Sequence, residues 1–150
     1  MKSFICGFSG AGKSFLLKER KQAGTPKTLF VDLDQYIFEN YAKGHECLGD
    51  FIRSVGIDEF RNLEYLALTK LVENKSIMIA LGGGALNERT SKLLESNGFE
   101  GEWLDTPFEI CFERIQNDKN RPLANLGKEK LSELFEERAK WYSVYKKISL

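Results

Sequence analysis

Residues 7–14 carry the pattern G-x-x-x-x-G-K-[ST], whose glycines let backbone N–H groups surround a phosphate. A short apolar run comes before it and a helical pattern follows, so a helix N-terminus adds its positive dipole end. Lys13 can reach the β- and γ-phosphates of a nucleotide, and the Ser14 hydroxyl can ligate Mg²⁺. The alternative is a glycine-rich turn that only closes a strand–helix unit.

Two carboxylates and three consecutive glycines follow later apolar runs. Asp32 and Asp34 come directly after residues 28–31, and the glycines come directly after residues 76–81. In a parallel sheet the carboxyl ends of the strands form the ligand crevice. We expect Asp32 to support Mg²⁺, Asp34 to accept a hydrogen bond from a substrate hydroxyl, and the glycines to let a ligand approach the backbone. The alternatives are a helix N-cap at Asp34 and a tight turn at the glycines.

Four arginines are candidates for anion binding. A planar guanidinium matches a carboxylate in a bidentate manner, and two of them can fix the orientation of a small acid. Taken singly, each arginine is equally well interpreted as a solvated charge, and Arg61 could pair with Glu64 one helical turn on. The four are Arg61, Arg114, Arg121 and Arg138.

Apolar runs alternate with helical patterns, which predicts an α/β fold with a mostly parallel sheet and helices on both faces. Residues 117–127 are polar and aperiodic, which is typical of a functional lid or of a surface connection. Strands are expected at 3–6, 28–31, 76–81, 101–105 and 147–150, and helices near 13–22, 35–43, 59–73, 87–96, 107–116 and 128–144.

Composition limits the partners. The 150 residues fit one domain, and 22 Lys+Arg balance 22 Asp+Glu, so no global field attracts nucleic acid or a membrane surface. No segment approaches the ~18 consecutive apolar residues of a membrane span. Three widely spaced cysteines form no metal-ligand pattern, and Cys6 and Cys111 are expected in the core. We expect a reducing compartment, and no general-base role for His45, the only histidine.

Taken in order, these motifs resemble the shikimate kinase family over residues 4–150. The phosphate loop alone indicates only a nucleotide-binding superfamily, whereas the glycine triplet with two arginine motifs is much more specific. The shared motifs are residues 7–14, Asp32-x-Asp34, Phe60-Arg61-x-x-Glu64, Gly82-Gly83-Gly84, Arg121-Pro122-Leu123, and Arg138 followed by Tyr142. The resemblance implies a three-layer P-loop kinase fold with a five-stranded parallel sheet of order 2-3-1-4-5. It also implies a lid at about 117–127 and a substrate-binding helical section at about 34–64.

The resemblance further implies transfer of the γ-phosphoryl group of ATP to the 3-hydroxyl of shikimate, with Mg²⁺. That reaction belongs to the shikimate pathway of aromatic amino acid biosynthesis. The implied catalytic residues are Lys13, Asp34 and Arg121. The implied nucleotide site is Gly10, Ala11, Gly12, Lys13, Ser14, Phe15, Arg114 and Arg121. The implied acceptor site is Asp34, Arg61, Gly82, Gly83, Gly84 and Arg138, and the metal site is Ser14 with Asp32. We expect a cytoplasmic monomer that binds no nucleic acid and no membrane.

The chain departs from the family pattern at several positions. Phe15 stands where the family has Thr, Phe38 and Ile57 stand where it has acids, and Lys140 stands where it has Pro. The sequence also ends at Leu150, before the family's adenine-contacting loop and final helix. Two alternatives therefore stay open: a kinase for another hydroxy acid such as gluconate, and a kinase-like nucleotide-binding protein without transfer activity.

Overall fold

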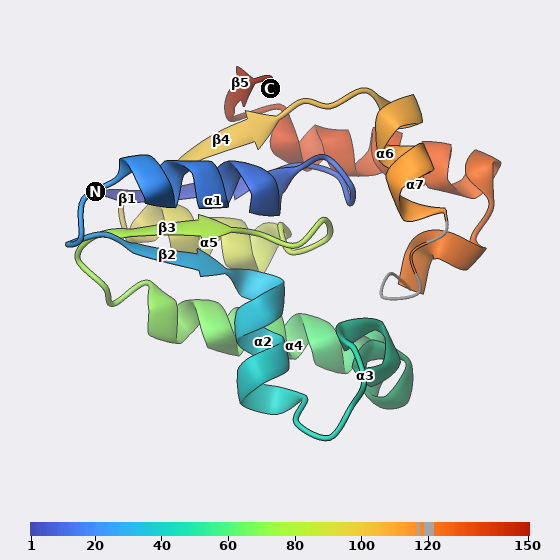
Figure 1. Ribbon diagram of the computed structural model, residues 1–150, viewed down its shortest axis with the longest axis horizontal. Helices are drawn as coiled ribbons and strands as arrows, with labels where there is room; N and C mark the ends of the chain where they lie inside the picture. The colour runs from blue at the N-terminus through green and yellow to red at the C-terminus, as the bar shows by residue number, and fades with distance from the viewer. Residues whose placement is uncertain (117, 119–121) are drawn as a thin grey trace.

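The structure is a computed structural model that describes residues 1–116, 118 and 122–150 (Figure 1). Its five strands are all parallel and lie in the order β2-β3-β1-β4-β5. The predicted α/β class and strand order are therefore confirmed. The strands are β1 (Lys2–Cys6), β2 (Leu29–Asp32), β3 (Ile77–Ala80), β4 (Glu100–Leu104) and β5 (Lys146–Ile148).

Burial explains why the central strands are almost continuously apolar. In β1, Phe4 and Ile5 are fully buried, and all four residues of β3 are buried as well. Phe4 lies in register with Ile79 on one side and Gly101 on the other. A strand covered on both faces needs no alternation of polar and apolar residues. The edge strand β5, by contrast, has mostly exposed residues.

Helices cover both faces of the sheet. Figure 1 shows α1 in front of the strands and α5 behind them, whereas α2, α3 and α4 form a separate group below β2. The helices are α1 (Lys13–Ala23), α2 (Leu33–Tyr41), α3 (Leu48–Val55), α4 (Ile57–Leu71), α5 (Glu88–Ser96), α6 (Phe108–Ile115) and α7 (Lys128–Tyr142), with a 3₁₀ turn η1 (Pro122–Asn125). Within the described ranges, no helix is long and apolar enough to cross a membrane.

Sequence patterns located these elements to within about two residues, with one omission. Helix α3 was not predicted, although Leu48, Phe51, Ile52 and Val55 have the spacing of an amphipathic helix. It is only eight residues long, and its N-cap Cys47 makes no side-chain capping bond. A short helix without a capping residue offers few start signals.

A bidentate ion pair fastens α1 to the sheet. Arg20 Nη1 and Nη2 donate to the two carboxylate oxygens of Glu102 on β4, at 2.7 and 2.9 Å. Both side chains are about three-quarters buried, with 28% and 24% exposed. The hydrogen bonds from Arg20 are the main cause that lowers the pKa of Glu102 from its ordinary value of 4.5. This pair thus stabilises the fold only while Glu102 is ionised.

We predict that Glu102→Gln lowers the free energy of unfolding at pH 7 by about 1 kcal/mol. Because the folded-state pKa lies below the unfolded one, the stabilisation is present above pH 4.5 and is lost as the pH falls through the folded pKa. Urea denaturation at pH 7 and pH 3 should show the difference shrinking. Glu88→Gln, which removes a largely exposed partner of Lys92, is the control. An equal loss at both pH values would contradict this account.

Candidate active site

The phosphate loop has the backbone that its glycines were expected to allow. Gly10 and Gly12 adopt φ values of +83° and +105°, which disfavour any residue with a Cβ. A Cβ on Gly10 would also lie 2.9 Å from the Cys111 carbonyl and from the Ile115 side chain. The loop therefore packs closely against α6 before Gly12 caps the N-terminus of α1. Cys111 and Cys6 are buried, as predicted for core residues.

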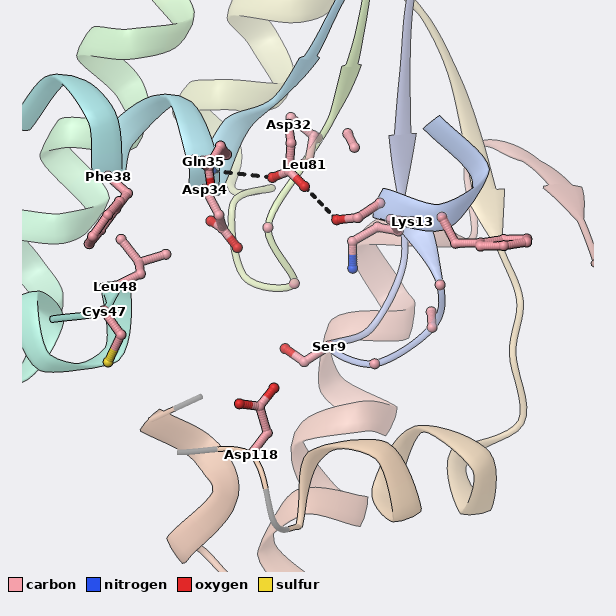
Figure 2. Close-up of a pocket in the computed structure, with 18 of the residues that line it drawn as sticks. Ser9, Lys13, Asp32, Asp34, Gln35, Phe38, Cys47, Leu48, Leu81 and Asp118 are labelled. Carbon is pink, nitrogen blue, oxygen red and sulfur yellow. Dashed lines mark hydrogen bonds between the residues drawn. The ribbon is translucent and has the colours of Figure 1, made fainter. Parts of the chain in front are cut away.

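Lys13 is held at the mouth of this loop. Its side chain is almost buried, and its ammonium donates to the carbonyls of Gly7 and Phe8, the latter at 2.9 Å. In Figure 2 the ammonium points into the space between the loop and Asp34. A buried cation bonded to loop carbonyls is oriented before a ligand arrives.

Asp32 has two partners at the end of β2. One oxygen accepts the hydroxyl hydrogen of Ser14, and the other accepts from the backbone N–H of Gln35 at 3.4 Å (Figure 2). Asp32 is thus the N-cap of α2, and the alternative that placed the cap at Asp34 is wrong. The reason is that α2 begins at Leu33, two residues earlier than predicted.

The Ser14–Asp32 pair fits a magnesium site. A hydroxyl and a carboxylate are oxygen ligands of the kind Mg²⁺ takes, and Mg²⁺ usually keeps several waters and substrate phosphates. Among the described residues, no three or more His, Cys, Asp or Glu side chains gather to form a complete metal cage. A cation held by this pair would therefore take its remaining ligands from phosphate oxygens and water.

The glycine triplet after β3 is the meeting point of the site. A Cβ on Gly82 would lie 2.7 Å from an Asp34 carboxylate oxygen. A Cβ on Gly83 would lie 2.6 Å from Ser9 Oγ of the phosphate loop and 3.2 Å from Arg138 Nη1. A Cβ on Gly84 would collide with Arg61 and lie 2.7 Å from Arg138 Nη2. The three glycines thus let Asp34, Ser9, Arg61 and Arg138 approach the backbone closely, with Arg138 beside both Gly83 and Gly84.

Arg61 and Arg138 form a guanidinium pair beside this turn. Arg61 Nη1 donates to Glu64 Oε1 at 2.6 Å, which is the alternative pairing named above. Arg61 nevertheless lies beside the glycine turn, where a ligand-binding arginine is expected. Burial lowers the pKa of Arg138, and the positive charge of Arg61 lowers it further. The Arg138 guanidinium also lies 5.7 Å from the centre of the Phe8 ring. Two half-buried cations in contact with one glycine favour an anion between them.

Glu64 is the buried counter-charge of this pair. It is 1% exposed, and among the described residues its second oxygen, Oε2, has no hydrogen-bond partner. Burial raises the pKa of Glu64 to about 7, although Arg61 opposes the rise. Glu64 therefore cancels the guanidinium charge only in part, and the pair keeps a positive field toward the turn.

A cleft of about 400 Å³ joins the phosphate loop, Asp32, Asp34 and the first two glycines of the turn. Figure 2 shows Lys13 and Asp34 on facing sides, with Phe38, Cys47 and Leu48 forming a side wall and Asp118 opposite Ser9. Arg61 and Arg138 lie against Gly83 and Gly84 but are not among the residues that line this cleft, and neither is Gly84. The sequence-predicted lining residues are Gly10, Ala11, Gly12, Lys13, Ser14, Phe15, Asp32, Asp34, Gly82 and Gly83.

The two remaining predicted arginines are Arg114, which lies beside the phosphate loop, and Arg121, which lies outside the described residues. Arg114 Nη1 donates to the Gly10 carbonyl at 2.9 Å and would lie 3.5 Å from a Cβ on Gly12, so it is beside the phosphate loop. Arg121 lies outside the described residues, together with 117, 119 and 120. Its assigned role therefore stays a prediction.

Tyr142 contacts the glycine turn, and no local sequence pattern predicts this contact. It is buried in α7, and its hydroxyl donates to the Gly83 carbonyl, 59 residues away in sequence. Burial is the main cause that raises its pKa, so the phenol stays a donor. Its spacing of four from Arg138 places both side chains on one helix face, which is the only sequence signal for this contact.

Comparison with known proteins identifies the family of the chain. The family model for shikimate kinase matches residues 9–150. A shikimate kinase from Persephonella marina is 35% identical over 142 residues, covering 93% of this chain and 82% of that protein.

Two solved structures have the same fold along nearly the whole chain. Shikimate kinase from Acinetobacter baumannii, in complex with shikimate, gives a TM-score of 0.84 at 27% identity, covering 99% of this chain and 82% of that one. Shikimate kinase from Aquifex aeolicus gives 0.79 at 30% identity, covering 99% and 86%. The chain therefore belongs to the shikimate kinase family.

Proposed function

We propose that this protein transfers the γ-phosphoryl group of ATP to the 3-hydroxyl of shikimate, a step in aromatic amino acid biosynthesis. Membership of the shikimate kinase family supports the reaction class. The observation that carries the assignment to this chain is the glycine turn, where the phosphate loop, Asp34 and the guanidinium pair all come into contact range. A nucleotide and a small acid bound to these groups would meet at that turn.

In this proposal Arg61 and Arg138 bind the carboxylate of shikimate, and the backbone N–H of Gly83 adds a hydrogen bond. Asp34 accepts the proton of the attacking hydroxyl while that oxygen forms a bond to the γ-phosphorus and ADP leaves. Lys13 and the N–H groups of residues 10–15 bind the phosphates and stabilise the charge that is transferred. The phosphate loop and the charged side chains around it would thus supply positioning and charge neutralisation, which are most of what phosphoryl transfer requires.

The reaction uses Mg²⁺, as in the rest of the family. Ser14 and Asp32 would hold it, and when bound it neutralises negative charge on the phosphates. The hydrogen bond between Ser14 and Asp32 supports this assignment, because it keeps two hard oxygen ligands together at the loop.

We assign two further segments by the same reasoning. Residues 34–64 would form the acceptor-binding section, because they supply Asp34, Arg61 and the side wall of the cleft. Residues 117–127 would form the lid, with Arg121 over the transferred group and Arg114 against adenine. Within that segment, η1 lies against α3, which links it to the acceptor side.

We also propose that the protein is a cytoplasmic monomer. Cys6, Cys47 and Cys111 are free thiols, as a reducing compartment allows. Light scattering after size-exclusion chromatography tests the monomer, with a dimer mass as the contradictory result.

A coupled assay of ADP release with Mg-ATP and shikimate tests the reaction itself. Turnover well above the ATPase background is expected. Gluconate and other hydroxy acids form the comparison panel, since they separate acceptor choice from phosphate transfer. Folded protein that turns over a different acid would assign another acceptor, and nucleotide binding without any product would indicate a binding protein.

Lys13→Ala should lower kcat by at least ~100-fold, because the side chain is the principal cation of the phosphate site. The control is Lys18→Ala, which removes an exposed lysine from the same helix and should change neither kcat nor KM. Steady-state kinetics and melting temperatures should be measured on both. Full activity in the Lys13 variant would show that the phosphate site is misassigned.

Gly84→Ala should raise the KM for shikimate by about tenfold or more, because the new methyl group displaces both guanidinium groups. The displaced atoms are the ends of flexible side chains, so the melting temperature should change little. Gly101→Ala makes the contrast: its Cβ would strike the rigid rings of Phe4 and Tyr145, and we expect lost stability instead. Unaltered shikimate kinetics in folded Gly84→Ala would contradict the proposed acceptor site.

A further inference from the structure

Phe15 is an aromatic residue beside the phosphate loop whose side chain is not part of the hydrophobic core. It lies on the first turn of α1, where the next two residues, Leu16 and Leu17, are buried in the core. Its own side chain is 59% exposed, yet it lines the cleft together with the loop glycines. Because the ring contributes little to the core and lies beside the polar phosphate loop, its position favours a contact with a bound ligand.

The direction of a bound nucleotide follows from the charged groups. Lys13 faces the Asp34 side of the cleft, and the Ser14–Asp32 pair lies at the end of β2 (Figure 2). Since the lysine of such a loop reaches the β- and γ-phosphates, the terminal phosphate is on that side. The nucleoside must then leave the loop at its other end, along the first turn of α1.

A second flat group lies at that end of the loop. The Arg114 guanidinium is fixed by its hydrogen bond to the Gly10 carbonyl at 2.9 Å, and it would lie 3.5 Å from a Cβ on Gly12. Gly12 and Phe15 are three residues apart, so they belong to the same turn at the start of α1. The Phe15 ring and the Arg114 guanidinium therefore both lie where the sugar and base of a bound nucleotide would extend from the phosphate loop.

We propose that the Phe15 ring packs against the sugar and base of the bound nucleotide and, with Arg114, provides the affinity for the nucleoside part. This inference rests on the proposed kinase function. Every base has a π-face, so an aromatic platform binds bases with little discrimination among them. Phe15 should accordingly strengthen binding of ADP and GDP alike, without choosing between them.

The test separates the nucleoside from the phosphates. Binding of ADP, GDP and inorganic tripolyphosphate is measured by calorimetry for wild type, Phe15→Ala and Phe15→Trp. Leu29→Ala is the matched control, because it removes an exposed apolar side chain, 45% exposed, at the opposite end of the sheet. Phe15→Ala should bind ADP and GDP about tenfold more weakly and tripolyphosphate as tightly as wild type. Its KM for ATP should rise by more than its kcat falls.

Phe15→Trp should retain tight ADP binding, and the emission of the new indole should change with ADP but not with tripolyphosphate. Equal weakening of ADP and tripolyphosphate in Phe15→Ala would mean that the ring only shapes the loop, and the inference would fail. Unchanged ADP binding would overturn it as well. If wild type binds no nucleotide at all, the proposed kinase function fails first; if wild type binds ADP and the variants match it, only the role of Phe15 is lost.

Discussion

The active-site cleft depends on a stretch of backbone that carries no side chains. Residues 82–84 follow a buried central strand, so the sheet fixes their position. Asp34, Ser9 and the guanidinium groups of Arg61 and Arg138 approach this backbone so closely that a single methyl group would displace one or more of them. The strand order brings Ser9 and Asp34 to this backbone, since the carboxyl ends of β1, β2 and β3 lie side by side in the sheet, whereas Arg61 and Arg138 come from α4 and α7.

The charge balance of the site favours the binding of anions. The guanidinium pair is half buried and only partly neutralised by Glu64, whose own pKa is raised by burial. The loop adds a lysine, oriented N–H groups and a helix N-terminus on the other side of the same turn. These positive groups reduce the repulsion between two bound anions, so a carboxylate and a phosphate chain can bind close together.

Sequence reasoning located most of this site, and its gaps have physical causes. The phosphate loop, the Asp32–Asp34 pair and the glycine triplet are local patterns at strand ends, so one topology rule brings them together. The contact between Tyr142 and Gly83, and the burial of Glu64, depend on packing between distant elements. The sequence pattern did not predict the short helix α3 because it has no side-chain capping bond, although its apolar residues have helical spacing. Asp32 rather than Asp34 caps α2. The sequence pattern misplaced this cap by two residues because it defines helix boundaries less sharply than helix interiors.

The most direct test is a crystal structure of the protein with ADP, Mg²⁺ and shikimate bound together. We predict the shikimate carboxylate between Arg61 and Arg138, and the 3-hydroxyl of shikimate near Asp34, facing the terminal phosphate of ADP across the glycine turn. Shikimate bound away from the guanidinium pair, or with a different hydroxyl facing the phosphate, would contradict it.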